Sequence, residues 1–227
     1  MRSRPALAAL LVLGCVASLP VLAAQGYKFG QEEEADRAEE QARSARIAEQ
    51  LSTPCRASLK DKKIMVVIGV RQSNGWIAAQ QQNYGPHFHA INARLRALGL
   101  RTYTPEEIRR QIAQAEIDAY FRNDPDAMLS ASKRLGASFV LRGLISSQAT
   151  RNPMMNVNQV NVNMTFTLYG SDGRFIADNV ASTGSYAGAN VEGMALTLVN
   201  EKADEVVPAL YADYCRNAGA GRKPTAH

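Results

Sequence analysis

The pattern of hydrophobic and polar positions predicts a helix followed by a central strand in residues 135–148, LGASFVLRGLISSQ. Leu135 and Gly136 are typical of a helix C-terminus, where glycine adopts a left-handed conformation without strain. From Phe139 to Ile145 the side chains follow a period of two, which is typical of a β-strand. Because this strand follows a helix directly, we expect it to lie in the middle of the core, with the elements on both sides of it in the sequence packed against it.

The residues before this segment alternate between strand and helix patterns. The continuous apolar run at 64–70 predicts a strand that is covered on both faces. Apolar residues three and four positions apart then predict a helix that runs from Phe88 to Gly99, and residues 100–103 predict a short strand.

Two further helices have clear start signals. Residues 104–107 (TPEE) match a capping box with proline at the first helical position. We expect Ile108, Ile112 and Ala115 to form the buried side of that helix. Residues 124–125 (DP) predict the start of the next helix in the same way.

The last third of the chain predicts a hairpin and one more helix. Residues 160–168 alternate apolar side chains with Asn and Thr, 170–173 (GSDG) predict a turn, and 174–186 predict the return strand. Asn190 predicts the N-cap of a long final helix with a bend at Pro208. The expected fold class is α/β (α+β): a single mixed β-sheet flanked by helices, with an antiparallel meander of strands three to five and a long C-terminal helix.

Residues 1–24 predict a secretory signal peptide. Arg2 and Arg4 precede an apolar run at 6–14, and residues 21–23 form a small-residue cleavage pattern. We therefore expect the mature chain in the periplasm.

Two alternatives for the N-terminus stay open. Residues 12–15 resemble a lipobox, which predicts lipidation at Cys15. Residues 6–24 contain no charge and could remain as an uncleaved anchor. A membrane is therefore expected as a partner only through such a lipid or anchor.

The rest of the chain divides into three predicted parts. Residues 25–55 predict a polar helical spacer, because the segment favours helix but has almost no large apolar side chains. A partner-binding helix is the alternative interpretation of this segment. Residues 56–216 predict a single α/β domain, and 217–227 a disordered tail.

Cys55 and Cys215 are the two cysteines that remain once the predicted signal peptide is removed. An even pair in an oxidising compartment is most simply a disulfide. The bridge would join the approach to the first strand with the final helix and would stabilise the domain. Catalytic thiol chemistry fits this pair less well.

Charge and motifs exclude several classes of function. The formal net charge is +5, of which Arg2 and Arg4 supply two, and no block of Lys and Arg is long enough to predict a nucleic-acid site. The sequence has no phosphate-binding glycine loop, no Gly-x-Ser-x-Gly motif and no Ser-x-x-Lys motif. The pair His87 and His89 has no Cys or acidic residue close in sequence to complete a metal site. We expect no enzymatic activity, no cofactor and no metal.

The candidate partner-binding residues come from two segments. Residues 71–86 follow the first strand, where α/β sheets usually place a binding surface, and contain Trp76 and Tyr84. Asn161 and Asn163 lie on the polar side of the predicted hairpin. An alternative for the two aromatic residues is that they only fold the loop back on the domain.

The order of motifs resembles a group of bacterial envelope proteins. A helix ending in Leu135-Gly136-Ala137, a strand Phe139–Gly143 and a hairpin turn at Asp172-Gly173 resemble the domain shared by curli-secretion-channel lipoproteins, the amino-terminal domain of TolB-like proteins and lipoprotein activators of penicillin-binding proteins. The resemblance spans roughly residues 62–215. It implies an envelope protein that docks on other envelope proteins, sometimes as a ring, and it transfers no catalytic residues.

The sequence therefore predicts an exported binding or accessory protein of the bacterial cell envelope. Its expected partners are other envelope proteins, and homo-oligomers are possible, but not nucleic acid. The alternative is a self-assembling structural or channel-like component of an envelope secretion system. A membrane pore is not expected, because lipid would not accept the polar hairpin side that bears Asn161 and Asn163.

Overall fold

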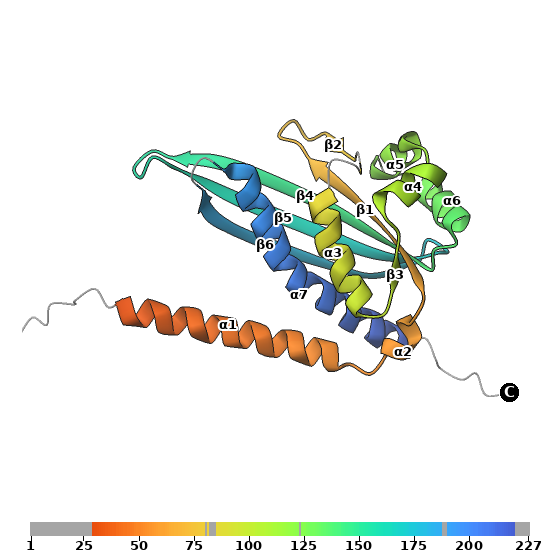
Figure 1. The fold of residues 1–227 in the computed structure, drawn as a ribbon, viewed down its shortest axis with the longest axis horizontal. Coiled ribbons are helices and arrows are strands. Elements are labelled where there is room, and N and C mark those ends of the chain that lie inside the picture. The colour runs from red at the N-terminus through yellow and green to blue at the C-terminus, as the bar shows by residue number, and fades with distance from the viewer. Residues whose placement is uncertain (1–28, 80, 82–84, 123, 188–189, 221–227) are drawn as a thin grey trace, which may run out of the picture. The chain divides into compact units, whose positions relative to one another are not determined.

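The structure is a computed structural model that describes residues 29–79, 81, 85–122, 124–187 and 190–220. These residues form one six-stranded sheet and seven helices (Figure 1). The strands are β1 (Lys63–Arg71), β2 (Ile77–Ala78), β3 (Arg101–Thr102), β4 (Phe139–Asn152), β5 (Val157–Gly170) and β6 (Phe175–Ala187). The helices are α1 (Phe29–Ser52), α2 (Arg56–Leu59), α3 (Gly85–Ala97), α4 (Pro105–Gln111), α5 (Gln114–Phe121), α6 (Pro125–Leu135) and α7 (Val191–Ala220).

The strand β4 lies in the middle of the sheet. The strand order is β2-β1-β4-β5-β6, and β3 pairs with the same edge of β1 as β2 does. β4 runs parallel to β1, with Ile64 opposite Phe139, and antiparallel to β5, with Phe139 opposite Gly170. The predicted mixed sheet, antiparallel meander and long C-terminal helix are confirmed. The meander comprises β4, β5 and β6, because the short strand β2 was not predicted.

One face of the sheet packs against α3 and α7, which lie side by side across it (Figure 1). Along β4 this face carries Phe139, Leu141, Gly143 and Ile145, and all four are buried. Gly143 leaves room for the ring of Phe166 on β5, because a Cβ atom at residue 143 would lie 2.6 Å from that ring. This face forms the main core of the domain.

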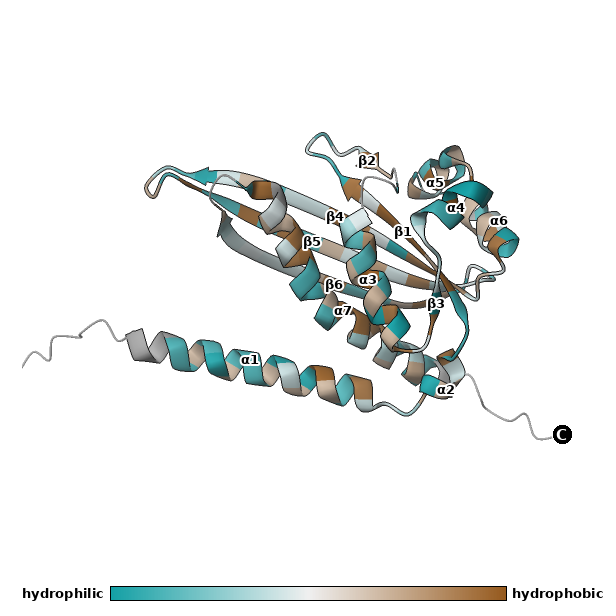
Figure 2. Cartoon of the chain, in the orientation of Figure 1, coloured by the Kyte–Doolittle hydropathy of each residue, from teal (hydrophilic) through white to brown (hydrophobic). Residues whose placement is uncertain are grey.

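The opposite face of the sheet is covered at one end only. There α5 and α6 pack over Val140 and Arg142 of β4, and Phe121 of α5 lies against Gly69 of β1. Towards the other end, β4 and β5 extend beyond β1, whose last residue pairs with Ser146 (Figure 1). Figure 2 shows hydrophobic and hydrophilic residues alternating along these strands.

The helix starts follow the predicted capping signals, with one correction. Thr104 and Glu107 form the capping box of α4, and the Asp124 side chain accepts from two backbone amides at the start of α6. Residues 105–121 are two helices rather than one, because Ile112 has an extended backbone and the Glu116 side chain accepts from the amide of Ala113 to start α5. Ile112 is buried as predicted, but Ala115 is exposed.

The side chain of Gln81 takes the place of a strand residue beside β1. It is fully buried, its Oε1 accepts from the Ile68 amide at 2.9 Å, and its Nε2 donates to the Ile68 carbonyl at 2.8 Å. These two bonds satisfy the backbone groups of β1 in the gap between β2 and β3. The segment after β1 is therefore fixed to the sheet at Gln81.

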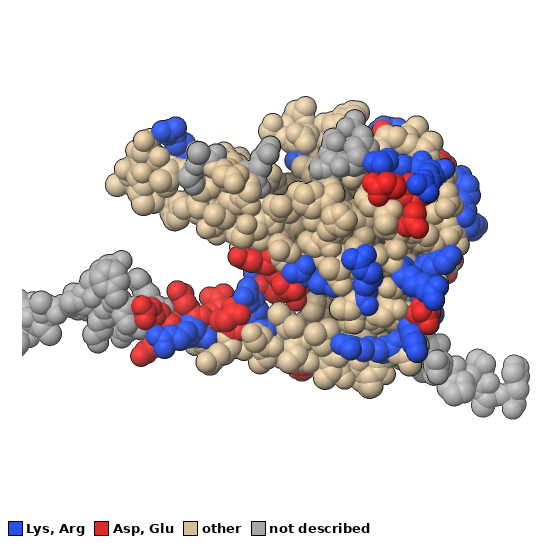
Figure 3. Space-filling view, in the orientation of Figure 1, with Lys and Arg blue, Asp and Glu red and all other residues tan. Residues whose placement is uncertain are grey.

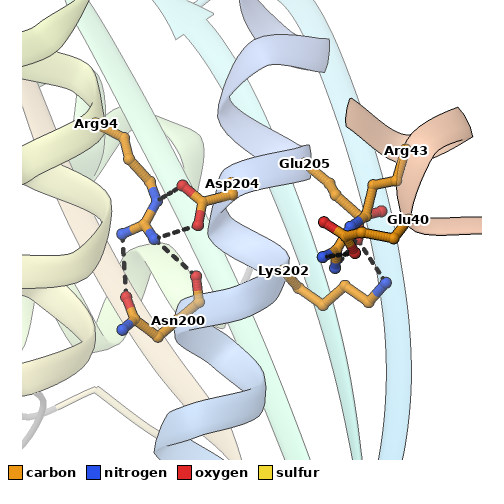
Figure 4. Close-up of polar contacts among 7 residues, drawn as sticks. All are labelled: Glu40, Arg43, Arg94, Asn200, Lys202, Asp204 and Glu205. Atoms are coloured by element: carbon orange, nitrogen blue, oxygen red, sulfur yellow. Dashed lines mark hydrogen bonds and ion pairs between the residues drawn. The ribbon is translucent and has the colours of Figure 1, made fainter. Parts of the chain in front are cut away.

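The chain divides into two compact units, residues 1–39 and 40–227, and the second contains the sheet. α1 occupies most of the predicted polar spacer and is hydrophilic over most of its length (Figure 2). Within the second unit, Arg43 of α1 lies 3.6 Å from Glu205 of α7, which also pairs with Lys202 at 2.7 Å (Figure 4). The predicted boundaries at residues 24, 55 and 216 stay predictions.

A second set of polar contacts ties α3 to α7 (Figure 4). Arg94 of α3 donates to both carboxylate oxygens of Asp204, at 2.6 and 2.8 Å. It also donates to the side chain and the carbonyl of Asn200, at 3.1 and 2.9 Å. The Arg94 side chain is only 22% exposed, so this fork geometry stabilises more than an open surface pair would.

Replacing Arg94 by Ala should lower the free energy of unfolding by about 1–3 kcal/mol, because four hydrogen bonds between α3 and α7 are lost. Urea unfolding followed by circular dichroism measures this. Arg101→Ala is the matched control, since its pair with Asp61 is exposed on both sides and should contribute about 0–1 kcal/mol. If both variants lose the same free energy of unfolding, the contacts of Arg94 with Asp204 and Asn200 stabilise the domain no more than an exposed ion pair does.

The structure joins Cys55 and Cys215 by a disulfide, as the sequence predicted. Their Cα atoms are 5.7 Å apart and 160 residues apart in sequence, within the range that a bridge requires. Tyr211 of α7 supports the same junction, because its hydroxyl donates to the Thr53 carbonyl and accepts from the Cys55 amide. The bridge fixes the segment before β1 to the C-terminal part of α7.

Reduction of this disulfide should lower the melting temperature by on the order of 10 °C, since closing so long a loop contributes about 4–5 kcal/mol in the chain-entropy model. Differential scanning calorimetry with and without a reductant measures the shift. The double variant Cys55→Ser, Cys215→Ser should melt at the lower temperature and not respond to reductant. A reductant effect that persists in the double variant would show that the bridge is not its source.

Candidate partner-binding surface

The register of the sheet brings separate segments into one row on its second face. Ile77 of β2 pairs with Arg71 of β1, which pairs with Ser146 of β4; Ser146 pairs with Asn163 of β5, and Asn163 with Ser182 of β6. Strands lie about 4.8 Å apart, so Ile77 and Asn163 are roughly 14 Å apart, three strand spacings. Trp76 directly precedes Ile77 and lies in the turn at the β2 end of this row, but the row itself contains Ile77, because successive side chains along a strand alternate between faces.

A set of uncharged residues forms what we call the polar sheet face. They share the second face of β4, β5 and β6 beyond the part that α5 and α6 cover, and each is exposed or partly exposed. The set is Ser146, Gln148, Asn161, Asn163, Thr165, Val180, Ser182, Gly184 and Tyr186. Arg71 and Asp178, both exposed, flank it.

Asn161 and Asn163 differ in their surroundings. Asn163 is exposed, whereas Asn161 is partly buried because its side chain lies over Gly184 of β6. A Cβ atom at residue 184 would lie 2.5 Å from the Asn161 amide oxygen. The absence of a side chain at Gly184 therefore leaves the space that the Asn161 side chain occupies.

Trp76 lies in the turn between β1 and β2. The Gln72 amide donates to the Trp76 carbonyl at 2.8 Å, and the Trp76 amide donates to the Asn74 side chain at 3.0 Å. These bonds fix the turn, but the Trp76 side chain is 60% exposed. Its indole is thus available for contact with another molecule. Tyr84 and Cys15 lie outside the described residues.

The end of the β4–β5 hairpin is nearly free of charge. Between residues 146 and 163 only Arg151 is charged, and Figure 3 shows charged side chains gathered over the helices instead. Met154 and Met155 at the hairpin turn are 94% and 54% exposed, and Val180 and Tyr186 on β6 are 65% and 53% exposed.

These four apolar residues were missed from the sequence. The adjacent methionines in a turn were a signal that could have found two of them, because a turn does not normally carry two large apolar side chains.

The described residues contain no group of three or more His, Cys, Asp and Glu that could hold a metal ion. His87 and His89 both lie near the start of α3, where His87 is partly buried and His89 is exposed. Burial lowers the pKa of His87, which favours its neutral form. Within the described part of the chain, no helix combines the length and apolar character needed to cross a bilayer.

No protein-family model and no curated protein matches the chain. Among solved structures, lipoprotein GNA1162 from Neisseria meningitidis matches with a TM-score of 0.36 and 14% identity over 62% of this chain and 96% of that chain. The PelC dodecamer from Paraburkholderia phytofirmans matches with a TM-score of 0.40 and 15% identity over 65% of this chain and 88% of that chain.

The LpoB C-terminal domain from Salmonella enterica matches with a TM-score of 0.34 and 15% identity, over 60% of this chain and 91% of that chain. With identities and TM-scores this low, these matches carry no argument about what the chain does.

Replacing Trp76 by Ala should change the free energy of unfolding by less than about 1 kcal/mol, because most of the indole surface already contacts solvent. Binding to a partner should weaken by at least tenfold if the indole anchors the complex. Thermal melting and a binding titration on the same sample separate the two effects. A large loss of stability would instead assign Trp76 to the fold.

Proposed function

We propose that this protein is an exported accessory protein of the bacterial cell envelope that docks on another envelope protein and performs no catalysis. The docking surface is the polar sheet face together with Trp76. Export to the periplasm rests on the signal-peptide pattern at 1–24 and agrees with the bridge between Cys55 and Cys215.

The observation that carries this proposal is a sheet face that α5 and α6 cover at one end only, together with an exposed tryptophan in the turn before β2. Asn, Gln, Ser and Thr side chains offer hydrogen bonds without the cost of desolvating charge. Trp76, Val180 and Tyr186 add the apolar and aromatic area that protein interfaces concentrate at their centre. A surface of this chemistry fits an uncharged polar and aromatic patch on a folded protein partner.

Site-specific photo-crosslinking in living bacteria tests the proposal. A photoreactive amino acid at residue 163 and, separately, at residue 76 of the full chain should capture the same envelope protein. The same amino acid at the exposed Lys133 of α6 is the control and should capture nothing specific. Adding Asn161→Lys to the residue 76 probe should abolish capture, because it buries an unpaired charge in the contact.

The self-assembling component is the alternative outcome of this experiment. It predicts that residues 163 and 76 crosslink to a second copy of the same chain, at the mass of a dimer or larger ring. The accessory-protein proposal is overturned by that result, and also by the absence of any specific product at both positions.

A further inference from the structure

A small cavity lies between the second face of the sheet and the helices α5 and α6. Its volume is about 220 Å³. The residues that matter for its chemistry are Tyr120 of α5, Met128 and Leu129 of α6, Val140 and Arg142 of β4, and Tyr169 of β5. The cavity and the polar sheet face are on the same face of the sheet, but at different positions along the strands. The polar sheet face begins beyond the part that α5 and α6 cover.

Arg142 supplies a positive charge inside this mainly apolar cavity. Its guanidinium carbon lies 5.3 Å from the ring centroid of Tyr120 and 5.2 Å from that of Phe121, which fits cation–π contacts with both rings. Among the described residues, Arg142 forms no ion pair. Across the sheet it faces Thr167, and the nearest carboxylate in that row is the exposed Asp178 of β6.

Two buried polar atoms in the cavity wall have no hydrogen-bond partner among the described residues. They are Nε of Arg142 and the hydroxyl oxygen of Tyr120. Tyr120 is only 8% exposed. Burial raises the pKa of Tyr120, so its hydroxyl stays protonated and can donate. A buried hydrogen-bond donor without an acceptor destabilises the fold. Both donors belong to residues that line this cavity, so a single ligand group could accept from both of them.

We infer that this cavity binds a short apolar group that ends in a carboxylate. The carboxylate accepts from Nε of Arg142 and from the Tyr120 hydroxyl, and the apolar part packs against Met128, Leu129 and Val140. An Arg donor is suited to a carboxylate because it delivers a charge-assisted hydrogen bond in a fixed direction. The volume is below the roughly 300 Å³ at which drug-sized pockets begin, so the apolar part is short.

The same chemistry has two sources: a free alkyl carboxylate, or the C-terminal residue of a polypeptide with an apolar side chain. Isothermal titration of the purified full chain with octanoate tests the first source, and titration with N-acetyl-alanyl-leucine tests the second. Octanol and the C-terminal amide of the dipeptide are the matched probes without a carboxylate. At least one carboxylate should bind ten times or more tightly than its matched probe.

Three variants connect the binding to the cavity. Arg142→Gln should abolish the preference for the carboxylate, and Tyr120→Phe should weaken carboxylate binding by roughly tenfold while leaving the ring contact with Arg142 in place. Arg151→Gln removes one charge at the far end of β4 and should have no effect. Tyr120→Phe keeps the test valid if Arg142→Gln fails to fold.

The result for each source has a fixed meaning. Binding of octanoate alone assigns a free carboxylate, and binding of the dipeptide alone assigns a chain terminus. The inference is overturned if neither carboxylate binds at millimolar concentration, if the matched probes bind equally well, or if Tyr120→Phe binds like the original chain. None of these outcomes depends on the docking surface proposed above.

Discussion

The pairing of β4 with β1 on one side and β5 on the other determines where every other element of the sheet lies. The parallel register with β1 aligns Ile64 with Phe139, and the antiparallel register with β5 aligns Phe139 with Gly170. Because side chains on a strand alternate between faces, these two registers decide the face of every residue in three strands. A slip of one residue would turn the apolar side of β4 away from α7 and expose it.

The same pairing explains why the two faces of the sheet serve different purposes. One face is closed by α3 and α7, which the Arg94 contacts with Asp204 and the bridge from Cys55 to Cys215 hold in place. The other face is closed only where α5 and α6 pack, since β4 and β5 extend beyond the end of β1. The open part of that face is the docking surface that we propose, and the covered part contains the cavity around Arg142.

The two proposed sites differ in their electrostatics. The polar sheet face has no charged member, so it offers hydrogen bonds and apolar area with little long-range attraction or repulsion. The cavity has a single cation whose charge is met by two aromatic rings and by no carboxylate of the described residues. The first arrangement suits a broad contact with a folded protein, and the second suits one small anionic group.

Local sequence determined most of the elements, because periodicity and capping act over a few residues. The strand that follows Gly136, the capping box at Thr104 and the cap at Asn190 could all be predicted, as could the pairing of Cys55 with Cys215. The break before α5 was missed because Ile112 fits a continuous helix pattern, and because the N-cap residue Ala113 has no side-chain oxygen that would mark a helix start.

Only the tertiary structure decided what the surface residues do together. Residues as distant in sequence as Ile77 and Asn163 share a row through strand register, and Tyr120 and Arg142 meet through helix packing on a sheet face. In the sequence, Gln81 is one polar residue among several in its loop. Only the structure shows that its side-chain amide pairs with the backbone of Ile68. Such pairings depend on contacts between segments far apart in the chain, whereas a local pattern of hydrophobic and polar residues records only which side of its own element each residue occupies.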